Sequence, residues 1–253
     1  GAGRLRGIGR ASAVALAMLG ANVTITGTGR DPSTYPDDEK LANWRDIEST
    51  AEQVTAAGSK CLTVVTDITN SKDVQRMVDR TLDEFGRVDI LINNAAFTRG
   101  PDRVPVVDMD DSIFRRVLDI KIMGTYLASK AVGNVLINQA QGGKIINVSS
   151  AASKRGLANT SAYNAANFAI NGFTQALAKE LGPYGVNVNA VCPGFVETSR
   201  MDGLSREDVT GIGIRRIGTD QEVGEFIAYL CTNAAEWIHG QAININGGSI
   251  MEH

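Results

Sequence analysis

The residues best placed to do chemistry are a serine and a tyrosine, Ser150 and Tyr163. The serine follows an apolar run that favours a strand, and the tyrosine lies near the start of a stretch that favours a helix. Two such hydroxyls brought together at a strand end can pass a proton to or from a carbonyl oxygen. A phenol titrates near ~10 unless a neighbouring group stabilises its anion. One helical turn after Tyr163 the chain has Asn167, which brings an amide and no charge.

A second chemical signature is the glycine-rich segment Gly3-xxx-Gly7-x-Gly9, which runs into a helix of small residues. Backbone N–H groups in such a turn can approach a pyrophosphate, and the helix N-terminus adds partial positive charge. The same pattern also fits a tight turn that packs a helix on a strand. A phosphate-binding turn normally follows a strand, so we expect further residues before Gly1.

The elements that must position these residues alternate along the chain. We predict strands at 23–26, 61–66, 90–92, 144–148, 186–191 and 242–245, and helices at 10–19, 46–57, 71–85, 161–181 and 222–233. The region 111–139 is predicted to be one long helix or two abutting helices. The polar segment 27–44 is predicted to be a loop. This alternation predicts an α/β fold, a doubly wound parallel sheet of Rossmann type with helices on both faces, in a single domain over 1–253. Such sheets bind ligands at the carboxyl ends of their strands.

Composition excludes several classes of function. The 253 residues are 43% hydrophobic and 21% charged, as in globular proteins, and the net charge of −3 gives no support for nucleic-acid or membrane-surface partners. The three cysteines lack metal-ligand spacing, so we expect no metal site and a reduced, cytoplasmic protein. No apolar run reaches the roughly 18 residues of a membrane helix, and no signal peptide is visible.

Several ordered motifs together resemble those of the short-chain dehydrogenase/reductase family over nearly the whole chain. Besides the glycine segment and the Ser150–Tyr163 pair, they are Asp67-Ile68, Asn93-Asn94-Ala95-Ala96, Pro193-Gly194 with Thr198, and Asn246-Gly247-Gly248. The resemblance is to 3-oxoacyl-reductase-like and sugar- or cyclic-alcohol-dehydrogenase-like members. It implies hydride transfer between a nicotinamide cofactor and an alcohol or carbonyl substrate, and a homotetramer or dimer.

The resemblance also implies roles for the matching residues. The cofactor would be held by Gly3, Gly7, Ile8 and Gly9 at the pyrophosphate, Asp67 and Ile68 at the adenine, Asn93 and Ala95 through backbone groups, and Pro193, Gly194, Val196 and Thr198 around the nicotinamide. Ser150 would hold the substrate oxygen, and Tyr163 would be the general acid/base. For Asp67 and Asn93, a purely structural role in a turn remains an alternative.

Two positions of the family's Asn-Ser-Tyr-Lys active site differ here. Asn167 stands where the lysine is expected, and Lys121 stands where the asparagine is expected. In the family, that lysine lowers the pKa of the tyrosine and bonds the nicotinamide ribose. One hypothesis is that Lys121 reaches in and restores the charge. The alternatives are an ordinary helix lysine beside a degenerate site, and a Lys121 that itself acts as acid/base.

The choice between NAD and NADP depends on the residues that follow the predicted strand 23–26. Relatives that use NAD place a carboxylate at this strand end, where the present chain has Gly27 and Thr28. Arg4, Arg6 and Arg30 could instead bind the 2′-phosphate of NADP. We therefore expect NADP to be preferred, with NAD possible because Asp31 could turn toward the ribose.

The sequence thus favours an NADP-preferring oxidoreductase that acts on a small or medium-sized apolar alcohol or carbonyl compound. The alternatives are a catalytically degenerate dinucleotide-binding protein and a non-redox enzyme, such as a dehydratase, that uses the same Ser-Tyr pair. The segment between Thr198 and Arg216 is short for a substrate-covering lid, and we expect residues to be missing near Thr210.

Overall fold

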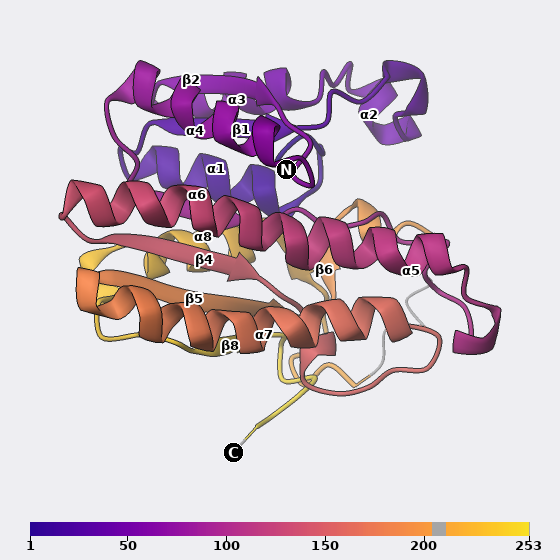
Figure 1. Ribbon diagram of the computed structural model, residues 1–253. Helices are drawn as coiled ribbons and strands as arrows, with labels where there is room; N and C mark the ends of the chain where they lie inside the picture. Colours follow the sequence, from indigo (N-terminus) through magenta and orange to yellow (C-terminus); the bar gives the residue numbers. More distant parts are fainter. Residues whose placement is uncertain (204–210, 253) are drawn as a thin grey trace.

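Strands and helices alternate in the computed structural model, which describes residues 1–203 and 211–252 (Figure 1). The helices are α1 (Ile8–Met18), α2 (Asp37–Leu41), α3 (Ile47–Ala56), α4 (Ser71–Phe85), α5 (Asp111–Leu118), α6 (Gly124–Gln139), α7 (Ser161–Leu181) and α8 (Asp220–Leu230). The strands are β1 (Val23–Gly27), β2 (Cys61–Val65), β3 (Ile90–Asn93), β4 (Gly143–Val148), β5 (Val186–Pro193), β6 (Val196–Glu197), β7 (Gly218–Thr219) and β8 (Ala242–Ile245). The predicted α/β class is confirmed.

Every strand pair in the described residues is parallel. The main sheet has the order β3-β4-β5-β8, and β1 pairs with β2 beside it. Gly1 and Ala2 lie between the two sheets. The Ala2 N–H donates to the Thr26 carbonyl at 3.0 Å, and the Asn94 side chain donates to the Gly1 carbonyl at 2.7 Å. The glycine segment is thereby attached to the strand ends on both sides.

Helices cover both faces of the sheets, and this burial explains the apolar strands. α1 packs against α8 and α3, whereas α6 packs against α4 and α7 (Figure 1). Ile145 and Ile146 are neighbours on β4, so their side chains point to opposite faces, and both are fully buried. Each lies in a separate apolar cluster, one under α4, α6 and α7 and the other under α8.

Local signals set the ends of the helices. The Asn70 side chain caps α4 by accepting from the N–H groups of Lys72 and Asp73, and Gly86 ends this helix with a φ of 76°. Thr219 and Glu222 form a capping box at the start of α8, with each side chain accepting from the other's backbone N–H.

One predicted segment differs from the structure. The expected loop 27–44 contains the short helix α2, because Asp37, Asp38 and Glu39 in its first turn favour a helix N-terminus. The helical region 111–139 consists of two abutting helices, α5 and α6, joined by a π-helical turn, Asp119–Met123. Such turns are rare and often mark functional sites, and this one holds Lys121.

Candidate active site

The carboxyl ends of the strands and the first turn of α1 open into one large cavity of about 1440 Å³. Its wall contains most residues selected from the sequence, namely Gly3, Arg6, Gly7, Ile8, Gly9, Thr28, Arg30, Asp67, Ile68, Ala95, Lys121, Ser150, Tyr163, Asn167, Pro193, Gly194, Val196 and Thr198. Residues from all parts of the chain therefore meet at the edge of the sheet where a doubly wound fold binds its ligands.

Asn93 is the exception among the selected residues. Its side-chain amide points into the protein and donates to Ser129 Oγ at 3.0 Å and to Asn147 Oδ1 at 2.8 Å. The cavity wall at this strand end is made by Asn94 and Ala95 instead.

The glycine segment leaves the start of α1 open to a ligand. Gly7 is the N-cap of α1, and no side chain caps the helix or places an acid in its first turn. The Gly7 N–H donates to Asp220 Oδ2 at 2.9 Å. An uncapped helix N-terminus in a cavity fits a pyrophosphate, because its N–H groups and its dipole both favour an anion.

The far end of the cavity, beside the end of β1, contains buried carboxylates that the sequence did not reveal. Asp46 Oδ2 lies 3.5 Å from the position of a Cβ on Gly27, although Gly27 itself provides no acid. Arg30 Nη1 pairs with Glu39 at 2.7 Å, and Arg30 Nη2 pairs with Asp46 at 3.0 Å. The strand-end position itself holds Gly27, as the sequence has it, but a carboxylate from another part of the chain stands beside it. Asp46 reaches it from the start of α3, nineteen residues further along the chain.

Three other charged residues were expected at this end of the cavity, and each has different contacts. Arg6 is paired with Asp38 at 2.7 Å and with Asp202 at 2.6 Å. Arg4 lines the cavity, and among the described residues its nearest acid is Glu39 at 3.8 Å. Asp31 does not turn toward the cavity, because its carboxylate accepts from the Ser33 N–H at 2.8 Å in an exposed turn. Of the three arginines expected at this end, Arg4 thus has the longest contact with an acid.

Asp67 and Ile68, which are expected at an adenine ring, both line the cavity, and Asp67 also stabilises a turn. Asp67 Oδ1 accepts from the backbone and hydroxyl of Thr69 at 2.9 and 2.7 Å, and these bonds lower the pKa of Asp67. Ile68 packs on the long helix at Gly124, where a Cβ would lie 2.8 Å from Ile68 Cγ2. The glycine therefore lets Ile68 occupy this part of the wall.

The Ser150–Tyr163 pair stands at the middle of the cavity wall. Ser150 Oγ accepts from the Ala152 N–H at 3.1 Å, which leaves its own proton free to be donated. Ser149 Oγ is directed away, toward the Asn167 carbonyl at 3.1 Å, so its role is structural. Asn167 Nδ2 donates to the Tyr163 carbonyl at 2.8 Å. Asn167 Oδ1 is buried without a hydrogen-bond partner among the described residues.

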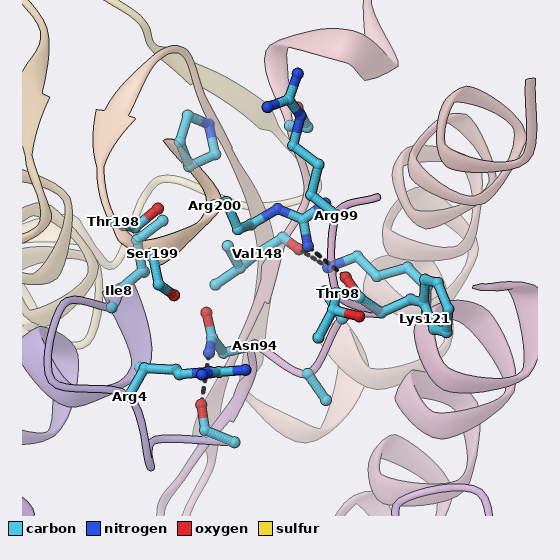
Figure 2. A pocket seen from close by; sticks show the side chains of 18 of the residues that line it. Arg4, Ile8, Asn94, Thr98, Arg99, Lys121, Val148, Thr198, Ser199 and Arg200 are labelled. Carbon is cyan, nitrogen blue, oxygen red and sulfur yellow. Dashed lines mark hydrogen bonds between the residues drawn. The ribbon is translucent and has the colours of Figure 1, made fainter. Parts of the chain in front are cut away.

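Lys121 projects from the π-helical turn into the same cavity (Figure 2). Its side chain is only 5% exposed, and its Nζ donates to the Val148 carbonyl at the end of β4. Burial, together with the nearby positive charge of Arg200, lowers the pKa of Lys121 to about 7. Lys121 is therefore not an ordinary solvated helix lysine.

Two arginines that the sequence did not single out flank the tyrosine. The Arg103 guanidinium lies 4.1 Å from the centroid of the Tyr163 ring, and the Arg200 guanidinium lies 5.1 Å from it. Arg200 also donates to the Phe97 carbonyl, and Figure 2 shows its guanidinium beside Lys121. Arg103 is seven residues beyond Ala96 and Arg200 two beyond Thr198, so proximity to these motifs was the available signal.

The segment after β5 lines the cavity and contacts the glycine segment. Pro193, Gly194, Val196 and Thr198 line it, and the Ser199 N–H donates to the Arg6 carbonyl at 3.2 Å. This segment thus packs against the glycine loop. The expected gap near Thr210 falls outside the described residues.

In residues 1–203 and 211–252, no group of histidine, cysteine and acidic side chains has the arrangement of a metal site. Within the same ranges, no helix is long and apolar enough to cross a membrane.

Comparisons with known proteins agree with this geometry. A protein-family model described as enoyl-(acyl carrier protein) reductase matches residues 1–249. The 3-oxoacyl-[acyl-carrier-protein] reductase of Synechocystis sp. is 34% identical over 98% of this chain and 95% of its own. The trans-4-hydroxycyclohexanecarboxylate dehydrogenase of Sinomonas cyclohexanicum is 36% identical over 97% of this chain and 90% of its own.

Solved structures show the same fold. A mutant short-chain dehydrogenase/reductase of Serratia marcescens superimposes with a TM-score of 0.84 at 29% identity and covers 98% of this chain and 95% of its own. The acetoin dehydrogenase of Enterobacter cloacae gives a TM-score of 0.80 at 29% identity, with 96% and 91% covered.

Proposed function

Because the chain belongs to the short-chain dehydrogenase/reductase family, we propose that it is an NADP-preferring enzyme with its reaction centre at Ser150 and Tyr163. Its relatives are dehydrogenases and reductases, so the chain is an oxidoreductase for alcohols or carbonyl compounds. One observation carries the proposal of the site. Ser150 and Tyr163 line the same cavity as the uncapped N-terminus of α1.

The proposed roles follow from the free hydrogen-bonding capacity of each group. A bound nicotinamide dinucleotide would supply or accept the hydride. Ser150 donates its free proton to the substrate oxygen, because its acceptor side already binds the Ala152 N–H. Tyr163 gives a proton to that oxygen during reduction and takes it back during oxidation. Asn167 Oδ1, buried and unpartnered in the described structure, is suited to accept from a ribose hydroxyl of the dinucleotide.

In this proposal, the positive charge near the Tyr163 phenol does not come from position 167 of helix α7, which is an asparagine. It comes from residues in other parts of the chain. Arg103 and Arg200 lie close to the Tyr163 ring, where a cation stabilises a phenolate by Coulomb attraction. Lys121, with a pKa near 7, is proposed to relay the proton within the cavity. Its hydrogen bond to Val148 also fixes the strand end that carries Ser150.

The preference for NADP rests on Arg4. Arg30 and Arg6 are already paired with carboxylates, whereas Arg4 faces the cavity with an acid no nearer than 3.8 Å among the described residues. A 2′-phosphate would bring this guanidinium a close charged partner. Asp46 supports the alternative, NAD, because its carboxylate lies beside Gly27 at the end of β1.

We also propose a cytoplasmic homo-oligomer, a tetramer or a dimer. Apolar side chains remain exposed on the outer faces of neighbouring helices, including Met123 and Tyr126 at the start of α6 and Phe168 on α7. A cluster of this kind is typical of a protein interface. Light scattering coupled to gel filtration tests this proposal, and a monomer at micromolar concentration would contradict it.

Binding and turnover should be measured separately to test the enzymatic proposal. Binding of NADPH and NADH is followed by cofactor fluorescence, and turnover is followed at 340 nm. The carbonyl panel contains acetoin-type ketones, 3-oxoacyl thioesters and 4-oxocyclohexanecarboxylate, because relatives are named for these classes. Tight cofactor binding without turnover of any panel member would favour a degenerate, dinucleotide-binding protein instead.

A further inference from the structure

We infer that the substrate of this site carries a carboxylate, and that Arg103 and Arg200 bind it beside Tyr163. This inference rests on the proposed function and names the class of substrate for the same site. The two guanidinium groups come from separate parts of the chain, one from the loop after β3 and one from the segment after β6.

Both arginines have unused hydrogen-bonding capacity at the cavity. Arg103 Nη1 and Arg200 Nη2 are buried, and neither has a hydrogen-bond partner among the described residues. Arg103 Nη1 lies 3.2 Å from Asp102 Oδ2 as an ion pair, but that contact lacks the alignment of a hydrogen bond. Buried polar groups normally have partners, so these N–H groups indicate a missing acceptor.

The surrounding charge favours an anion. Arg99 and Arg155 also line the cavity. The carboxylates nearby are already engaged, since Asp102 faces Arg103 and Asp202 is paired with Arg6 at 2.6 Å. Burial lowers the pKa of Arg103, the neighbouring Asp102 counteracts this, and repulsion from Arg200 and Arg99 adds to the lowering. An anionic ligand would relieve this repulsion.

The position of the arginines assigns the anion to the substrate. Pyrophosphate is expected at the N-terminus of α1, where the uncapped N–H groups lie. Arg103 and Arg200 instead approach the ring of the proposed acid/base residue. A planar carboxylate matches the fork of a guanidinium and accepts two hydrogen bonds at once. The compound therefore has an alcohol or ketone at Tyr163 and a carboxylate at the arginines.

Matched pairs of compounds test this inference with the full chain. Each pair is a keto acid and its methyl ester, namely 3-oxobutanoate with methyl 3-oxobutanoate and 4-oxopentanoate with methyl 4-oxopentanoate. We expect kcat/KM for at least one acid to exceed that of its ester by roughly tenfold to a hundredfold, the range of a hydrogen bond to a charged group. The Arg103→Gln and Arg200→Gln variants should each lower this acid-to-ester ratio at least fivefold. Arg80→Gln, an exposed arginine on α4, is the control and should leave the ratio unchanged.

The ratio separates substrate binding from any effect of the arginines on Tyr163, because that effect is common to both members of a pair. Calorimetric titration of 4-oxopentanoate into the NADP-loaded protein provides a second readout. Its heat of binding should be lost in Arg103→Gln. Turnover of esters and neutral ketones without preference for either acid would overturn the inference and leave the proposed function intact. Absence of turnover with every compound, with carboxylate binding retained, would overturn the proposed function alone. Absence of turnover together with absence of carboxylate binding would overturn the inference and the proposed function.

Discussion

The Arg103 guanidinium lies 4.1 Å from the centre of the Tyr163 ring. In the related active sites that the sequence resembles, a lysine one helical turn after the tyrosine provides the positive charge. Here that position is Asn167, and its amide is bound to the backbone carbonyl of Tyr163. The positive charge has therefore moved from the helix to a loop, although the tyrosine keeps its place at the cavity.

Replacing Tyr163 with phenylalanine tests its role as the acid/base. We expect kcat to fall about 10²–10⁴-fold, the usual contribution of a positioned proton donor, with little change in NADPH binding. The control is Tyr126→Phe on α6, which should retain the activity of the parent protein. Turnover of Tyr163→Phe within threefold of the parent would show that another group moves the proton.

Replacing Arg103 with methionine tests the charge beside the phenol. A cation over an aromatic ring contributes about 0.5–2 kcal/mol, so oxidation of a neutral alcohol should slow roughly 2- to 30-fold near neutral pH. Turnover equal to that of the parent would contradict this prediction, and a simultaneous loss of NADPH binding and thermal stability would indicate a role in folding only. Arg80→Met is the matched control.

Lys121 gives a prediction for stability against pH. Burial lowers its pKa in the folded protein to about 7, below its ordinary value of 10.5. Below about pH 7 the lysine is charged in both states, and the cost of burying that charge is fully present. As the pH rises from about 7 to about 10.5, the folded state binds fewer protons than the unfolded state, and the cost is lost.

The Lys121→Met variant should therefore be more stable than the parent at pH 6, by an amount on the order of several kcal/mol. The advantage should diminish toward pH 10. Urea unfolding of the cofactor-free proteins measures it, and Lys130→Met, an exposed lysine on α6, is the control. A difference that stays constant from pH 6 to pH 10 would show that Lys121 titrates normally.

The exchange of Lys121 and Asn167 tests whether the two positions share one function. Lys121→Asn should lower kcat/KM at least tenfold, because it removes the proposed proton relay. Adding Asn167→Lys should restore part of the loss by returning a cation to the helix beside Tyr163. Such a recovery is a coupling that independent sites do not show. If both single variants turn over like the parent, the two positions have no common role.

The sequence was sufficient for the fold because apolar periodicity and helix ends are local properties. The whole-chain alternation, the bounds of α4 and the positions of Ser150 and Tyr163 all followed from short stretches. Asp46, Arg103 and Arg200 did not, because none of them belongs to a motif. Asp46 approaches Gly27 only when α3 packs beside β1, and Arg200 meets Tyr163 only when the chain after β6 folds back. Proximity to a motif was the only signal for the two arginines, and the contacts themselves are tertiary.

The preference between NADP and NAD is tested by two variants with opposite expectations. Arg4→Gln should weaken NADPH binding about tenfold and leave NADH binding nearly unchanged, because only NADPH carries the 2′-phosphate that the guanidinium would bind. Asp46→Asn should improve NADPH relative to NADH, since it removes a negative charge near the same position. This second variant also frees Arg30, which is paired with Asp46 at 3.0 Å. Its folding is therefore checked by thermal unfolding before cofactor affinities are compared. NADH bound more tightly than NADPH by the parent, with no change in Arg4→Gln, would assign the site to NAD through the carboxylate of Asp46.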